Sequence, residues 1–253
     1  MTSFEKFIKE IKSCNTHSIP INFWWRDDDL VSDSDQFVKI CDISNNLSTP
    51  LLCSIIPRLI SNGLKLDGEN TSLVSYCQHG WAHINHEPDG ELKSEFGPHR
   101  SSLDVKVDIQ EGVNALKKKV GQKLLPIFVP PWNRFDSCHI EVLIELGFQY
   151  LSSYGLLEYP QTQADIHPIN THIDVIYWGK DGVHMRKLDE IYSTLTELLK
   201  QYQLNYKKIK NPEAIGILSH HRVMNRDDLE SLAQLISSIQ SIPGTSFIQP
   251  FLK

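Results

Sequence analysis

Residues 21–29 read INFWWRDDD, an apolar and aromatic run that ends in one arginine and three consecutive aspartates. The run has the composition of a buried strand, and the charges follow where such a strand would end. Adjacent carboxylates repel one another and cost stability unless a cation or a shared proton compensates. The cluster of Asp27, Asp28 and Asp29 is therefore either a solvated acidic loop before the next helix or part of a functional site.

The rest of the chain repeats this alternation of strand and helix. Alternating elements predict an α/β fold with a mainly parallel sheet, either a barrel or a doubly wound layer. No composition break marks a linker, so we expect a single domain over residues 1–253. The predicted strands are residues 21–26, 51–56, 73–77, 125–129, 150–153, 172–177 and 214–219, and the predicted helices follow caps at Ser34, Ser101 and Asp136 or cover residues 188–199 and 229–239.

Composition and charge exclude several classes of protein. The chain has 253 residues with 25 Lys+Arg against 31 Asp+Glu, a net charge of -6, which argues against a nucleic-acid partner. No run approaches the roughly 18 apolar residues of a membrane span. Charges stand where a signal peptide would be apolar, so we expect a cytoplasmic protein. The five cysteines are scattered without a C-x-x-C pair, which argues against a cysteine-based zinc site.

The third predicted strand ends in a histidine pair. Residues 78–86 read QHGWAHINH, and one helical turn would place His79 and His83 on the same face. The pair alone is weak evidence, because 11 histidines give roughly half an accidental pair at this spacing per chain. Its weight comes from its position after a strand, as with the aspartate cluster. One carboxylate and two imidazoles form a common ligand set for a catalytic divalent metal.

Two further polar clusters follow strands. Residues 128–134 read FVPPWNR, and the two prolines predict a rigid turn that could offer backbone N–H groups and an aromatic wall to a substrate. The alternative is a plain turn with a buried tryptophan. Residues 217–221 read ILSHH, so His220 leaves an apolar strand as either a core residue or a general acid.

Taken in order, these motifs resemble the polysaccharide deacetylase family, carbohydrate esterase family four, in a divergent and largely uncharacterised branch. The matching forms are Arg-x-Asp-Asp, His-Gly-x-x-His, Phe-x-Pro-Pro-Trp-Asn-Arg and Leu-x-His, which span residues 26–221. The resemblance implies a distorted (β/α) barrel of about seven parallel strands. It also implies removal of acetyl groups from sugars with a divalent metal, most often zinc, with cobalt, nickel and iron as alternatives.

The resemblance assigns roles by position. Asp28 becomes the general base and Asp29 a metal ligand, unless the register starts one residue earlier at Asp27. His79 and His83 complete the ligand set. Pro131 and Trp132 line the acetyl pocket and oxyanion site, and His220 protonates the leaving group; these three stand in the last two motifs.

The chain departs from the family pattern at three positions. Leu30 stands where members carry glycine, Val129 where they carry an arginine, and Tyr177 where an aspartate is expected. In the family, that arginine and aspartate orient the base and the histidine. Arg26, Arg134 or Asp174 could substitute for them.

The predicted function is thus a metal-dependent deacetylase acting on an N-acetylated sugar or related carbohydrate. A non-catalytic metal- or carbohydrate-binding relative would keep the fold and metal without turnover. A barrel amidohydrolase acting on a non-sugar amide would use the same water chemistry in a different pocket. Trp24, Trp25, Trp81 and Trp132 flank the motifs, either as sugar-stacking surfaces or as core.

Overall fold

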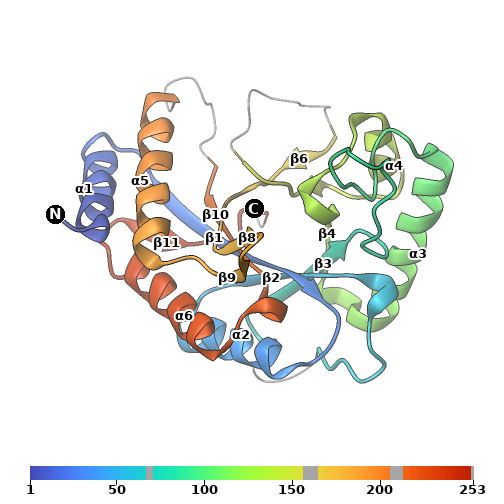
Figure 1. The fold of residues 1–253 in the computed structure, drawn as a ribbon, viewed down its shortest axis with the longest axis horizontal. Helices are drawn as coiled ribbons and strands as arrows, with labels where there is room; N and C mark the ends of the chain where they lie inside the picture. Colours follow the sequence, from blue (N-terminus) through green and yellow to red (C-terminus); the bar gives the residue numbers. More distant parts are fainter. Residues whose placement is uncertain (67–70, 156–164, 206–212, 252–253) are drawn as a thin grey trace.

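The computed structural model describes residues 1–66, 71–155, 165–205 and 213–251 (Figure 1). Its main sheet has nine strands in the order β6-β5-β4-β3-β2-β1-β10-β7, with β11 added beside β1, and all of its neighbouring strands run parallel. The strands are β1 Ile21–Leu30, β2 Leu51–Ile55, β3 Val74–His79, β4 Leu124–Val129, β5 Tyr150–Leu151, β6 His167–Pro168, β7 Thr171–Asp174, β10 Ile215–Ser219 and β11 Thr245–Phe247.

Helices cover the outside of the curled sheet (Figure 1). The largest core packs α1, α2, α5 and α6 onto it, and a second core lies beneath α3 and α4. The helices are α1 Ser3–Thr16, α2 Asp35–Asn46, α3 Ser102–Val120, α4 Ile140–Glu145, α5 Leu188–Asn205 and α6 Arg226–Gln240. No helix among the described residues is long and apolar enough to cross a membrane.

The sheet closes on itself through the segment that follows β5. Thr171, at the start of β7, donates its N–H to Ser153 over 3.0 Å and accepts from Gly155 over 2.8 Å. A parallel bridge also joins Tyr154 to Thr171. The sheet is therefore a distorted barrel, which confirms the predicted fold class.

The interior of the barrel is small and packed. Side chains alternate along β1, so Trp24 joins the inner cluster while Trp25 joins the outer core under the helices. Both indoles are buried, with 2% and 1% of their surface exposed. These two tryptophans are core residues, which is the second of the two interpretations that the sequence left open.

Most predicted strands are present, and the differences lie at their ends. β1 runs on to Leu30 because Arg26 and Asp27 pair with both β2 and β10, so the aspartates belong to the strand and not to a loop. The predicted strand 172–177 is broken at Val175, after which β8 (Ile176–Gly179) and β9 (Gly182–Met185) form an antiparallel hairpin. The helix expected after Asp136 opens as a 3-10 turn before α4.

The cap predictions for two helices are correct. Ser34 accepts the N–H of Phe37 over 3.2 Å, and Ser101 accepts that of Asp104 over 3.1 Å. Helix α1 was not predicted, although Thr2 and Glu5 form a reciprocal capping box at its start.

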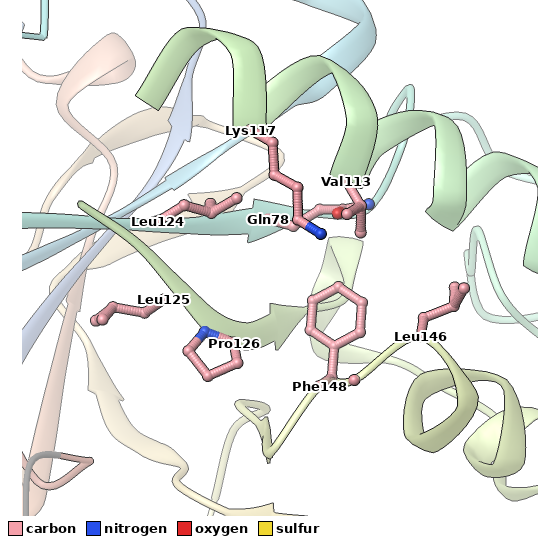
Figure 2. Close-up of a pocket in the computed structure, with 9 residues that line it drawn as sticks. Gln78, Val113, Lys117, Leu124, Leu125, Pro126, Leu146 and Phe148 are labelled. Atoms are coloured by element: carbon pink, nitrogen blue, oxygen red, sulfur yellow. The ribbon is translucent and has the colours of Figure 1, made fainter. Parts of the chain in front are cut away.

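A cavity of about 150 Å³ lies on the outer side of the barrel, between α3 and β4 (Figure 2). Gln78 lines it and donates to the carbonyl of Ile109 in α3 over 3.1 Å. Because neighbouring side chains of a strand point to opposite faces, His79 points into the barrel instead. The cavity is therefore separate from the polar clusters described next.

Candidate metal centre and active site

The polar clusters lie at one end of the barrel. They lie at or just after the carboxyl ends of β1, β3, β4 and β10, and these strands are parallel and lie close together in the sheet. The loops after parallel strands gather at one edge, where ligands and substrates bind in such folds.

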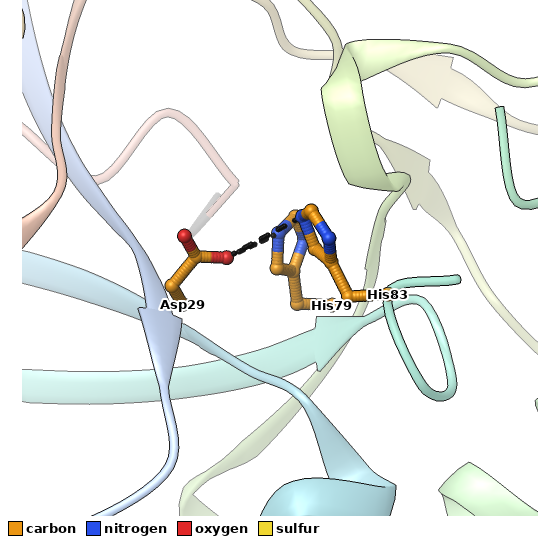
Figure 3. A group of neighbouring side chains, drawn as sticks. All are labelled: Asp29, His79 and His83. Atoms are coloured by element: carbon orange, nitrogen blue, oxygen red, sulfur yellow. Dashed lines mark ion pairs between the residues drawn. The ribbon is translucent and has the colours of Figure 1, made fainter. Parts of the chain in front are cut away.

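Asp29, His79 and His83 converge at this end (Figure 3). Asp29 Oδ1 lies 3.2 Å from His79 Nε2 and 3.6 Å from His83 Nε2. Ligands held about 2.1 Å from one ion in tetrahedral geometry are separated by about 3.4 Å. The three side chains are therefore spaced as ligands of a single ion.

The orientation of His79 supports this interpretation. Its Nδ1 lies 3.0 Å from the carbonyl of Val129, which can only accept, so Nδ1 carries the hydrogen. Nε2 of the neutral ring then presents a lone pair toward Asp29 Oδ1, a buried oxygen with no hydrogen-bond partner. Two lone pairs at this distance repel unless positive charge lies between them, which is either a proton on Nε2, favoured because burial is outweighed by Asp28 and Asp29, which raise the pKa of His79, or a metal ion that takes the place of that proton. The residues therefore fit a metal ion.

The two histidines come together through a tight loop and not through the helical turn that their spacing suggested. His79 ends β3, and both Gly80 and His83 have positive φ angles, 56° and 58°. A methyl group on Gly80 would overlap the Glu95 carboxylate and the ring of Pro131. Glycine is thus required by both the backbone angle and the packing.

Glu95 holds this loop, and sequence reasoning missed it. Its fully buried carboxylate accepts the N–H groups of Trp81 over 3.1 Å and Ala82 over 2.7 Å. Burial raises the pKa of Glu95, although these hydrogen bonds oppose the shift. Glu95 lies in an aperiodic charged segment with no motif, so only the tertiary structure links it to His83.

The three aspartates separate into three environments. Asp27 faces the helices, where it accepts from Ser219 Oγ over 2.6 Å and contacts the His221 ring. Asp28 faces inward and accepts from Arg26 Nη2 over 2.9 Å and from Ser54 Oγ over 2.6 Å. Asp29 has a φ of 72° at a register shift in β1, which turns its carboxylate toward the histidines.

Neighbouring charged side chains shift the pKa values of Asp29 and His83. Burial by itself raises the pKa of Asp29, but His79, His220 and His83 overcome it and hold the pKa well below its usual range. Burial and the neighbouring His79 lower the pKa of His83, which favours the neutral ring that a metal needs.

His220 is held beside a carboxylate and an indole. Asp174 Oδ1 lies 3.7 Å from its Nδ1, and Asp174 Oδ2 accepts from Trp178 Nε1 over 2.8 Å. The Trp178 ring stands edge-on to the imidazole, with 4.9 Å between centroids. Burial alone would lower the pKa of His220, but Asp174, Asp28 and Asp29 raise it to about 9. This raised pKa favours the protonated form of His220 at neutral pH.

Trp132 and Pro131 form a wall beside the histidines. The Trp132 ring lies 4.3 Å from that of His83, and its φ of 54° is unusual for a residue with a bulky side chain. Pro131 is buried against Gly80.

Two of the three candidate substitutes for the missing family residues lie in the site. Arg26 binds Asp28 within β1, three strands away from the β4 strand that carries Val129, and it also binds Asn133 Oδ1 over 2.6 Å. Asp174 lies beside His220. Arg134 instead donates to the carbonyl of Lys93 over 2.9 Å, away from both groups.

Comparisons with known proteins find relatives through the fold only. No family model and no curated protein matches the sequence. A protein from Mycobacterium smegmatis assigned to the polysaccharide deacetylases superposes with a TM-score of 0.57, 11% identity and coverage of 90% of this chain and 86% of that one. A family 4 acetyl xylan esterase from Clostridium thermocellum, solved with a cobalt ion, gives 0.50 with 12% identity and coverage of 90% and 87%.

A third structure is a mutant of a pseudoenzyme of the same esterase family, described as having restored activity. It superposes with a TM-score of 0.53, 14% identity and coverage of 90% of this chain and 65% of that chain. The chain thus has the fold of the carbohydrate esterase family four deacetylases. The resemblance seen in the sequence motifs is confirmed at the level of the fold.

Proposed function

We propose that this protein is a metal-dependent deacetylase, a hydrolase of carbon–nitrogen bonds other than peptide bonds. It would remove an acetyl or similar acyl group from an N-acetylated sugar or related carbohydrate, and residues 1–253 would form one catalytic domain. The observation that carries the proposal is the convergence of Asp29, His79 and His83, with Asp28 and His220 within electrostatic range of Asp29 or His79.

Asp29, His79 and His83 would hold the ion, with zinc as the first candidate and cobalt, nickel or iron as alternatives. When bound, the ion supplies positive charge that acidifies water and polarises the acyl carbonyl. One carboxylate and two neutral imidazoles leave the site a net positive charge and open positions for water and substrate.

Asp28 and His220 would move the protons. Arg26 and Ser54 fix the Asp28 carboxylate, which would take a proton from the attacking water. The water oxygen bonds to the acyl carbon, and the carbon–nitrogen bond breaks. His220 would give its proton to the leaving amine, a role that its raised pKa and its contact with Asp174 support.

The aromatic and proline side chains around the site support a sugar as the substrate. Pro131 and Trp132 would line the acyl pocket, and a backbone N–H there would contribute to the oxyanion site. Trp178 is 52% exposed beside His220, so its ring is free to stack on the C–H face of a sugar. If the protein works in the cytoplasm, as the sequence predicts, its substrate is a small sugar, a nucleotide sugar or a lipid-linked precursor.

The test is acetate release from a panel of N-acetyl sugars, run beside metal analysis of the purified protein. The proposal expects bound metal and acetate release, with both lost in Asp29→Asn. Metal without acetate release from any member would identify a non-catalytic relative. Release only from non-sugar amides would identify an amidohydrolase of another class.

A further inference from the structure

A second group of ligand-type side chains lies on the segment between β3 and α3. Glu87, Glu91 and His99 each offer one ligand atom, and these atoms lie within 4.8 Å of one another. His99 Nε2 is 3.2 Å from Glu91 Oε2 and 3.5 Å from Glu87 Oε2. These separations are close to the roughly 3.4 Å expected between tetrahedral ligands of one ion.

The carboxylate of Glu87 is buried, and its negative charge is stabilised only if a positive group lies next to it. Its side chain is only 3% exposed. Its Oε2 faces His99, and its buried Oε1 has no hydrogen-bond partner among the residues that the structure describes. The carboxylate fits against the backbone at Gly97, where any larger residue would overlap Oε1. A buried carboxylate whose only charged neighbour among the described residues is one half-exposed imidazole, 3.5 Å away, is costly, so this position favours an additional cation.

The protein supplies little of the charge that this group needs. Among the described residues, His99 is the only basic group within ion-pair distance of Glu87 or Glu91. A single imidazole, 48% exposed, faces two carboxylates.

Local hydrogen bonds hold the backbone of the loop that carries Glu87 and Glu91. The Asn85 side chain accepts the N–H groups of Glu87 over 3.2 Å and Ser94 over 2.9 Å, and it donates to the Glu87 carbonyl over 3.1 Å. A turn joins the Glu91 N–H to the Pro88 carbonyl over 3.1 Å. The backbone positions of Glu87 and Glu91 are therefore fixed, while the Glu91 and His99 side chains are about half exposed.

We propose that Glu87, Glu91 and His99 form a second metal site, distinct from the Asp29 centre, which binds a divalent transition-metal ion such as Zn²⁺. Carboxylate and imidazole ligands together suit such an ion, and water would complete its coordination at the surface. The ion would tie the turn at Glu87–Glu91 to the chain entering α3. Its presence does not depend on any deacetylase activity.

The test counts Zn²⁺ retained per chain after dialysis against a zinc-buffering chelator. We expect two ions in the wild type, one in Glu91→Gln/His99→Gln, and one in His79→Ala/His83→Ala. The first pair lies on exposed side chains, so folding is expected to survive and is checked by circular dichroism. The matched control is His86→Gln/Asp89→Asn, which changes the same types of exposed residue in the same loop and should retain both ions.

A second readout keeps the proposal testable without any variant of the catalytic centre. In a histidine-resolved NMR spectrum, the ring signals of His99 should shift as Zn²⁺ is added, and those of His86 should not. The proposal is overturned if Glu91→Gln/His99→Gln retains the same number of ions as the wild type. It is also overturned if the His99 ring signals do not respond to Zn²⁺.

Discussion

At the scale of single residues, consecutive aspartates have unlike surroundings because of how β1 is built. Strand alternation sends Asp27 to the helix side and Asp28 into the barrel. Alternation alone would return Asp29 to the helix side, but its positive φ at the register shift turns it to the histidines instead. This geometry favours Asp28 as the base and Asp29 as the ligand, with Asp27 as a structural group.

Substitution of each aspartate by asparagine should separate these roles. Asp29→Asn should lose the metal, because two neutral imidazoles then hold the ion alone. Asp28→Asn should keep the metal and lose turnover. Asp27→Asn should keep the metal but lower the free energy of unfolding by about 1–3 kcal/mol, because it disrupts buried hydrogen bonds to Ser219 and His221.

Metal analysis, acetate release and urea denaturation check these three outcomes. Metal loss in Asp28→Asn together with an inactive, metal-replete Asp27→Asn would instead support the earlier register. Three variants with unchanged metal content and turnover would contradict both registers, since each needs Asp28.

The pH dependence of turnover should report the Asp174–His220 pair. His220 acts in its protonated form, so kcat/KM should fall as pH rises through its pKa, which its neighbours raise to about 9. Asp174→Asn removes one of the anions that raise this pKa, so the alkaline limb should move to lower pH. Asp181→Asn, in the exposed β8–β9 turn, is the control and should leave the limb in place. An unmoved limb in Asp174→Asn would show that His220 is not the acid.

At the scale of elements, a side chain at Gly80 should destabilise the loop after β3 and move His83 out of position. Gly80→Ala meets both a positive φ and an overlap with Glu95 and Pro131. Gly121→Ala is a matched control, because Gly121 has a φ of 60° with open space around it. Both variants should lose about 1–3 kcal/mol from backbone strain. Only Gly80→Ala should also lose metal affinity, as measured by calorimetric titration with Zn²⁺.

The contrast between strands and loops also explains what the sequence could predict. Apolar runs and caps such as Ser34 and Ser101 report local physics, so most strands and helices were predictable. The approach of His83 to His79 depends on two positive φ angles and on Glu95, which is far along the chain in an aperiodic segment. The motif spacing therefore indicated two histidines that do lie together, but it predicted a helical turn where the structure has a loop with positive φ angles.

At the scale of the whole molecule, barrel closure and the candidate site share one residue. Arg26 lies fully buried inside the barrel, where its guanidinium binds Asp28 and Asn133 through Nη2. Through Nη1 it binds Ser152 Oγ over 2.6 Å and the Ser152 carbonyl over 3.1 Å. Ser152 follows β5 and in turn donates to the Ile169 carbonyl over 2.7 Å, near the start of β7. A single cation therefore connects β1 to the place where the sheet closes.

Arg26→Met should weaken the entire fold. Methionine fills a similar length without charge, so the buried Asp28 carboxylate loses its ion-pair partner and keeps only the Ser54 hydroxyl, and the Ser152 carbonyl loses the Arg26 donor. Removal of one partner from a buried ion pair costs about 3–5 kcal/mol, which urea denaturation would register as a lower free energy of unfolding. Arg226→Met breaks an exposed pair with Glu230, with side chains 87% and 59% exposed, and should cost less than about 1 kcal/mol. Equal losses in the two variants would show that Arg26 serves the orientation of Asp28 alone and does not secure the closed barrel.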